Sequence, residues 1–196
     1  MSLILASASP RRRELLTAAG YRFDVVAPSE LAECGVCSGE SPPELVARLA
    51  YQKAADVSTR VGPATIVACD TLAVCRGQVL GKPTDEDHAR RMLETLAGQP
   101  HRVYSGLCVW RVPEGQPLVH VDETLLRMDP LSPAQIEDYL ASGLWEGKAG
   151  AFGYQDRPGW LHIERGSESN VVGLPMELLT RMLAEIGFPA PAGWPL

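Results

Sequence analysis

The chain has 196 residues, with 18 Lys and Arg against 24 Asp and Glu, a formal net charge of −6 and 45% hydrophobic residues. This length and composition predict one soluble globular domain, or one domain with an additional lobe. The acidic balance argues against a nucleic-acid partner, because that role needs a broad basic surface, so any phosphate site must be local. No apolar run reaches the ~20 residues of a membrane helix, and the first six residues lack the charged start of a signal peptide. We therefore expect a cytoplasmic protein without a membrane partner.

The first predicted strand covers residues 3–6, and a turn and a helix follow it. Ser9 is expected to cap this helix, Pro10 suits its first position and Gly20 suits its end. A strand, a turn and a helix N-terminus in this order allow an anion to bind at the helix start.

A second helix is predicted from Ser41, because Ser41-Pro42-Pro43-Glu44 matches a capping box. Its apolar stripe includes Val46 and Val57, and Lys53 falls on the same stripe. The ammonium of Lys53 must therefore either reach solvent along its stem or find an anion.

Residues 64–69 form a nearly continuous apolar run that predicts a buried strand. Asp70 and Thr71 follow at its carboxyl end, where open α/β sheets bind their ligands. A carboxylate at this point suits a divalent metal or an oriented water, although a turn-capping aspartate would fit the pattern equally well.

Strands and helices alternate along the rest of the chain, which predicts an α/β fold with a mixed sheet. The predicted elements are a hairpin turning at 76–78, a helix from 84–87 to 98, paired strands at 103–112 and 118–128, a helix at 132–143, a strand at 160–164 and a last helix to 186. Residues 1–188 are expected to form a single domain and residues 189–196 a mobile Pro-rich tail.

Several hydroxyl and cationic side chains along the chain suit phosphate oxygens. They are Ser7, Ser9, Arg11, Arg12, Arg13, Lys82 and Lys148. Successive helical residues lie ~100° apart, so the three arginines do not all face one ligand. A solvated basic helix face explains the arginines as well, and lysines in Gly-containing turns are commonly only solvated.

Other chemistries have weaker support in the sequence. The Walker phosphate loop and the Gly-x-Ser-x-Gly nucleophile motif are both missing from the chain. Cys34 and Cys37 have the spacing of a zinc or redox site, but the histidines offer no second ligand pair for zinc. The motif also lies in a Gly/Ser-rich stretch before Ser41 and does not open a helix after a strand, which favours a coincidence in a loop. The odd number of five cysteines fits a reducing compartment and inert buried thiols.

Six ordered motifs resemble those of the Maf family, from Leu3 to about Gly187. They are residues 5–12 (LASASPRR), 48–54 (RLAYQKA), 70–71 (DT), 80–83 (LGKP), 148–155 (KAGAFGYQ) and 172–175 (VGLP). Two departures are modest: Ala68-Cys69 replaces the usual Gly-Ala, and Ala97 replaces a usual serine.

The resemblance implies the Maf α/β fold, a mixed twisted sheet with flanking helices and a ligand cleft, similar to the inosine triphosphatase family, in a protein that is commonly a homodimer. The implied activity is a nucleoside triphosphate pyrophosphatase of the branch that hydrolyses dTTP and UTP, and possible further substrates are modified pyrimidine nucleotides. The implied cofactor is a divalent cation, Mg²⁺ or Mn²⁺.

The resemblance also implies roles for individual residues. Asp70 would be catalytic and would hold the metal with Glu33, although Glu30 and Glu40 compete for that second place. Substrate contacts would come from Ser7, Ser9, Arg11, Arg12, Lys53, Thr71, Lys82, Lys148 and Gln155. The Gln155 amide carries the donor and the acceptor that a pyrimidine edge requires.

Two other functions fit the sequence less well. One is a purine-pool cleaner of the inosine triphosphatase kind, and the other is a nucleotide-binding regulator of cell division without catalysis. A redox protein built on Cys34 and Cys37 is a more distant alternative.

Overall fold

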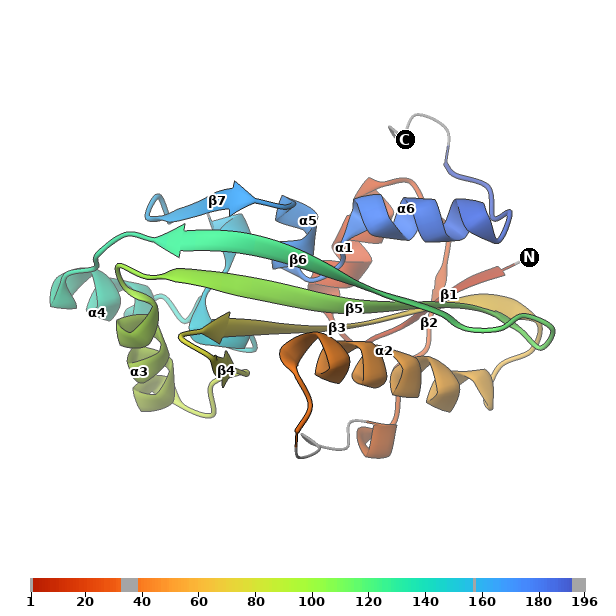
Figure 1. The fold of residues 1–196 in the computed structure, drawn as a ribbon, viewed down its shortest axis with the longest axis horizontal. Coiled ribbons are helices and arrows are strands. Elements are labelled where there is room, and N and C mark those ends of the chain that lie inside the picture. Colours follow the sequence, from red (N-terminus) through yellow and green to blue (C-terminus); the bar gives the residue numbers. More distant parts are fainter. Residues whose placement is uncertain (1, 33–38, 157, 192–196) are drawn as a thin grey trace. The chain divides into compact units, whose positions relative to one another are not determined.

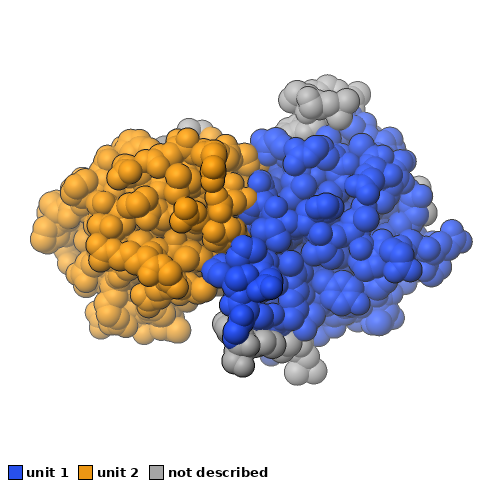
Figure 2. Space-filling view, viewed as in Figure 1, with its two compact units in different colours: residues 1–70, 105–122, 173–196 blue, residues 71–104, 123–172 orange. Residues whose placement is uncertain are grey.

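The computed structural model describes residues 2–32, 39–156 and 158–191 (Figure 1). The contacts divide the chain into two compact units, which Figure 2 shows in different colours. Unit 1 comprises Met1–Asp70, Ser105–Asp122 and Gly173–Leu196, and unit 2 comprises Thr71–Tyr104 and Glu123–Val172. Among the described residues, no helix is long and apolar enough to cross a membrane.

The strands pair in the order β2-β1-β3-β5-β6-β7, and β4 pairs with β3. Their bounds are β1 Ser2–Ala6, β2 Asp24–Val25, β3 Ala64–Cys75, β4 Gln78–Leu80, β5 Pro100–Val112, β6 Leu118–Met128 and β7 Leu161–Arg165. β1 runs parallel to β2 and β3, whereas the β3–β4 and β6–β7 pairs are antiparallel. The predicted mixed sheet is therefore confirmed.

In the described part of unit 1, the helices of nine residues or more are α1 (Pro10–Ala18), α2 (Pro42–Ser58) and α6 (Met176–Glu185). Figure 1 shows α2 and α6 on opposite sides of the unit 1 strands. Successive strand residues point to opposite faces. Leu5 and Val67 accordingly pack with α1 and α6, whereas Ala6 and Ile66 pack with α2. Both faces of the unit 1 strands are therefore covered, which explains their continuous apolar sequences.

The contact of α2 with the sheet depends on Gly106 of β5. A Cβ atom at this position would lie 2.0 Å from the carbonyl oxygen of Val46 and 2.6 Å from the backbone nitrogen of Ala47. Only a glycine therefore lets the α2 backbone approach the strand this closely. This approach also brings the next turns of α2, which carry Lys53, against the sheet.

Unit 2 has its own core, formed by α3 (Glu86–Leu96), α4 (Pro133–Ala141) and the strand residues of the unit. Two short 3-10 helices, η2 (Ala149–Ala151) and η3 (Tyr154–Asp156), carry the segment of small residues, and a further short 3-10 helix, η1 (Glu30–Ala32), lies in unit 1. The short helix α5 (Glu168–Val172) was not predicted from the sequence. Its five residues are too few to show a helical period.

Most predicted helix starts are confirmed. The Glu44 carboxylate accepts hydrogen bonds from the Ser41 amide and hydroxyl, at 2.8 and 2.6 Å, and these bonds hold the pKa of Glu44 below its ordinary value. Ser132 forms the same kind of box with Gln135. Ser9 stands at the predicted N-cap of α1, but its side chain makes no capping bond.

One expectation about the strands was wrong. The strand predicted over 64–69 continues to Cys75, so Asp70 and Thr71 lie inside β3 and not beyond its end. The strand continues because β4 pairs with residues 73–75. The carboxylate of Asp70 is tolerated there because it has a cationic partner. Glu33, Cys34, Cys37 and residues 192–196 of the predicted tail lie outside the described residues.

We predict that Gly106→Ala lowers the free energy of unfolding by about 3 kcal/mol, because backbone must move to admit the methyl group. Urea denaturation followed by circular dichroism measures the change. The matched control is Gly62→Ala, where a Cβ meets nothing within 4 Å and φ is not positive. The control should change stability by less than about 0.5 kcal/mol. Equal effects of the two substitutions would show that α2 does not require the close approach.

Candidate functional site

The centre of the candidate site in unit 1 is an ion pair between Lys53 and Asp70. The Lys53 ammonium donates to Asp70 Oδ1 at 2.7 Å, and the two side chains are 6% and 17% exposed. Strand alternation places Asp70 on the face of β3 that α2 covers, together with Ile66 and Ala68. Of the two outcomes left open for Lys53, the structure therefore shows the one in which it finds an anion.

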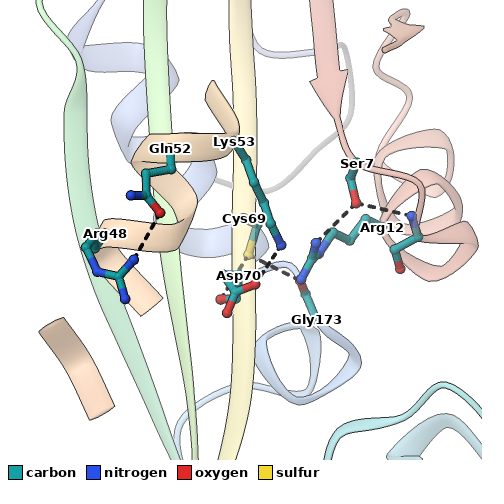
Figure 3. A network of polar contacts seen from close by, with 9 residues as sticks. Ser7, Arg12, Arg48, Gln52, Lys53, Cys69, Asp70 and Gly173 are labelled. Atoms are coloured by element: carbon teal, nitrogen blue, oxygen red, sulfur yellow. Dashed lines mark hydrogen bonds and ion pairs between the residues drawn. The ribbon is translucent and has the colours of Figure 1, made fainter. Parts of the chain in front are cut away.

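The side chain of Arg12 donates hydrogen bonds from different nitrogens to Gly173 and Ser7. Its Nε donates to the carbonyl oxygen of Gly173 at 2.7 Å, and its Nη1 donates to Ser7 Oγ at 3.1 Å (Figure 3). The Ser9 amide also donates to Ser7 Oγ, at 3.2 Å. Ser7 is buried. The turn between β1 and α1 is thus built around one hydroxyl, which fixes the guanidinium plane of Arg12.

The same network extends to β3 through Cys69. Its Sγ lies 3.3 Å from the carbonyl oxygen of Gly173, which also accepts from Arg12. Cys69 directly precedes Asp70, so the arginine and the carboxylate are joined through one carbonyl and one thiol (Figure 3). Ser7, Arg12, Lys53 and Asp70 therefore belong to one connected region of unit 1.

Arg11, Ser9 and Thr71 are placed less specifically. Arg11 and Ser9 are half-buried at the start of α1, and Thr71 is half-buried in β3. Arg11 precedes Arg12 on the helix, so the two side chains leave the axis in different directions, as expected from the helical period.

Unit 2 contains a second buried cation, Lys148. It pairs with Asp156, and their side chains are only 10% and 9% exposed. The Tyr139 hydroxyl donates to Asp156 Oδ2 at 2.9 Å and accepts from the Gly153 amide at 3.2 Å. A Cβ at Gly153 would lie within 3 Å of side-chain atoms of Lys148, Gln155 and Asp156. The structure thus gathers Lys148 and Gln155 over Gly153.

Lys82, by contrast, is an exposed side chain in the segment between β4 and α3. Its neighbour Gly81 accepts a hydrogen bond from the Gly150 amide at 3.0 Å. The two Gly-containing turns that carry Lys82 and Lys148 are therefore tied together by their backbones.

The sequence reasoning missed four contributors to these clusters: Cys69, Asp156, Tyr139 and the carbonyl group of Gly173. Asp156 directly follows Gln155, and a carboxylate beside that motif was the available signal. The sequence does not indicate the Gly173 carbonyl, because every residue has a backbone carbonyl and the residue type does not show which one accepts a side-chain bond. Its role depends on a positive φ of 124°, which favours glycine.

Comparison with known proteins places the chain in a family. Residues 2–186 match the family described as Maf-like protein. The chain belongs to the Maf family. A dTTP/UTP pyrophosphatase from Rhodopirellula baltica is 54% identical over 93% of this chain and 81% of the relative. A dTTP/UTP pyrophosphatase from Symbiobacterium thermophilum is 45% identical over 95% of both chains. A crystal structure of a nucleoside-triphosphatase, a dITP/XTP pyrophosphatase, from Mycobacterium abscessus is 15% identical, with a TM-score of 0.42, over 95% of this chain and 94% of that one.

In this Maf-family chain, the described residues contain no group of three metal-ligating side chains. Two of the acidic residues that compete to assist Asp70 lie in the described part of the chain. Glu30 is exposed on η1, and Glu40 accepts hydrogen bonds of 2.5 and 2.8 Å from the guanidinium of Arg48. The strong pairing with Arg48 disfavours Glu40 as a metal ligand. Glu33 lies outside the described residues.

The described cysteines of this Maf-family chain are free and buried: Cys69, Cys75 and Cys108. Burial raises the pKa of the Cys108 thiol to about 12 and also raises the pKa of Cys75. Cys75 and Cys108 are therefore protonated at neutral pH, as expected for inert thiols. The Cys34–Cys37 hypothesis stays untested.

We predict that Asp156→Asn lowers the free energy of unfolding by about 3 kcal/mol, because it leaves the buried ammonium of Lys148 without its anion. Adding Lys148→Met to the variant should restore part of the loss. Chemical denaturation measures both changes.

The control for this prediction is an exposed ion pair in the same unit. Arg165 and Glu123 are 72% and 32% exposed, so Arg165→Met should cost less than about 1 kcal/mol. A loss in Asp156→Asn as small as that of the control would contradict the prediction.

Proposed function

We propose that this protein is a nucleoside triphosphate pyrophosphatase that hydrolyses dTTP and UTP to the nucleoside monophosphate and pyrophosphate. The observation that carries the proposal is the pair of the buried Lys53 with the partly exposed Asp70, connected through Cys69 and Gly173 to the fixed guanidinium of Arg12. Relatives that match over nearly the whole chain bear the name of this activity. A purine-pool cleaner or a non-catalytic regulator has no comparable support.

The phosphates are the part of the substrate that unit 1 is suited to hold. An acidic protein with a net charge of −6 must gather cations locally to bind a polyanion. Arg12 and Lys53 are assigned to the phosphates, which would share the Lys53 ammonium with Asp70, and the start of α1 adds backbone donors and the positive end of the helix dipole. Arg12 also needs no reorganisation, because Ser7 and Gly173 already hold it.

Hydrolysis requires a water aligned opposite the leaving pyrophosphate. A bond forms between the water oxygen and the α-phosphorus while the bond from that phosphorus to the bridging oxygen breaks, so that pyrophosphate leaves and the proton of the water passes to solvent. We assign Asp70 to orient this water through its carboxylate. Lys53 fixes the carboxylate by binding Oδ1.

A divalent cation is part of this proposal. Asp70 fits such an ion because a carboxylate has about four acceptor positions, of which Lys53 occupies one. Mg²⁺ is commonly held by one or two carboxylates together with substrate phosphates, so a single well-placed aspartate is compatible with it. When bound, the cation would lower the pKa of a coordinated water and neutralise developing charge on the phosphates.

The nucleobase is assigned to Gln155, whose amide supplies both a donor and an acceptor. Thr71 and Arg11 are assigned to further substrate contacts, and Lys82 and Lys148 to phosphates. Lys148 is paired with Asp156, so phosphate would have to compete with that carboxylate for the ammonium. We further propose a cytoplasmic homodimer.

We predict that Asp70→Asn lowers turnover of dTTP by at least about 100-fold, because an amide neither fixes the water nor holds the cation as a carboxylate does. Purified protein is incubated with dTTP, UTP, ITP and dGTP and with Mg²⁺ or Mn²⁺, and the products are separated by ion exchange. Monophosphate and pyrophosphate support the proposal, whereas diphosphate and orthophosphate show that another bond is cut.

Two controls accompany the Asp70 variant. Loss of the anion beside Lys53 also affects stability, so the Asp70→Asn protein must be shown to be folded by circular dichroism at the assay temperature. Asp56→Asn removes a carboxylate from the exposed end of the same α2 helix, where it binds Ser29, and should leave turnover within about twofold. Near-normal turnover by folded Asp70→Asn would remove the aspartate from the mechanism.

A separate prediction concerns base selection. Gln155→Ala should reduce the preference for dTTP over purine triphosphates more than it reduces kcat, because only the contact to the base is lost. The ratio of kcat/KM for dTTP to that for ITP measures the effect. An equal loss on both nucleotides would show that Gln155 does not read the base.

A further inference from the structure

The carbonyl oxygen of Gly173 accepts from two side chains, which use both of its lone pairs. Arg12 Nε lies 2.7 Å from its oxygen, and Cys69 Sγ lies 3.3 Å from the same oxygen. The two donors come from α1 and β3, and Gly173 itself leads into α6. Three segments far apart in the sequence therefore meet at one oxygen atom (Figure 3).

The backbone of Gly173 is set to present this oxygen. Its φ of 124° lies in the region that residues with a Cβ atom rarely adopt. Two residues later, Pro175 forms the N-cap of α6, and Leu174 and Met176 are buried. The peptide is thus fixed on its C-terminal side by the core of unit 1.

Cys69 is positioned to fix the same carbonyl from the strand side. The residue is fully buried, and strand alternation turns its side chain away from the face that holds Asp70. Its thiol hydrogen has a second acceptor 3.7 Å away, the carbonyl oxygen of Asp70, but the Gly173 oxygen is closer. The thiol therefore restrains the oxygen that Arg12 binds.

We infer that Cys69 is a positioning residue for Arg12, acting through the carbonyl of Gly173. The thiol keeps this carbonyl in the orientation that holds Arg12 Nε, and Ser7 holds Nη1, so the guanidinium is presented to the substrate phosphates in one orientation. Asp70 follows Cys69 on the same strand, so one stretch of β3 places both the carboxylate and, indirectly, the arginine. The inference rests on the proposed function in assigning phosphate to Arg12.

The experiment compares Cys69→Ala, which removes the thiol donor, with Cys69→Ser, which keeps a donor of similar size. The matched control is Cys108→Ala, another buried cysteine of unit 1 that packs on the α2 side of the sheet. Two quantities are measured: the hydrogen-exchange rate of the Arg12 Nε–H by NMR, and the Kd for inorganic tripolyphosphate by calorimetry. The NMR signal of this group is assigned by its loss in the Arg12→Lys protein.

We expect Cys69→Ala to accelerate Nε–H exchange and to raise the Kd for tripolyphosphate about three- to tenfold, the effect of losing one neutral hydrogen bond. Cys69→Ser should restore both quantities to within about twofold of the wild-type values, and Cys108→Ala should change neither. For dTTP, the Cys69→Ala substitution should raise KM more than it lowers kcat.

A double-mutant cycle separates positioning from general stability. In the Arg12→Lys background there is no Nε to hold, so adding Cys69→Ala should leave the Kd for tripolyphosphate unchanged. The inference is overturned if Cys69→Ala leaves either measured quantity at its wild-type value, if Cys69→Ser fails to restore them, or if the two substitutions have additive effects. Exchange of the Arg12 Nε–H does not depend on catalysis, so the absence of dTTP hydrolysis by the wild-type protein would count against the proposed function alone.

Discussion

The buried ammonium of Lys53 constrains the rest of unit 1. A lysine that is removed from water needs an anion at hydrogen-bond distance, and Asp70 supplies it at 2.7 Å. That distance requires α2 to lie close to the sheet, which Gly106 permits by leaving no Cβ atom in the way. It also requires the register of β3 that points Asp70 toward α2. The helix contact, the strand register and the ion pair therefore depend on one another.

Unit 2 follows the same principle with different residues. Lys148 is buried and paired with Asp156, and Tyr139 satisfies a further position on that carboxylate. In both units, a cation assigned to the substrate phosphates is matched by a carboxylate in the described structure. Such pairing offsets the cost of removing the cation from water, and it holds the ammonium group in a defined position.

Local signals in the sequence predicted the elements well where the physics is local. Ser41 with Glu44 and Ser132 with Gln135 start helices through side-chain bonds three residues apart, so short segments carry the complete signal. Prediction was weaker where the partner was distant. The strand at 64–69 was expected to end before Asp70 and a separate hairpin to turn at 76–78, whereas β3 runs without a break from Ala64 to Cys75. No local signal indicated that Lys53, 17 residues away, pairs with Asp70.

The sequence by itself determined the family, the alternation of strands and helices, and the candidate residues Ser7, Arg12, Lys53 and Asp70, because motif order and periodicity are properties of the chain. Only the tertiary structure decided which of them meet. The Lys53–Asp70 pair and the Gly173 carbonyl that joins Arg12 to Cys69 depend on contacts between segments far apart in the chain, and the Lys148–Asp156 pair depends on how the turns between η2 and η3 fold. Such contacts are fixed by packing and backbone conformation, and a backbone oxygen has no letter in the sequence.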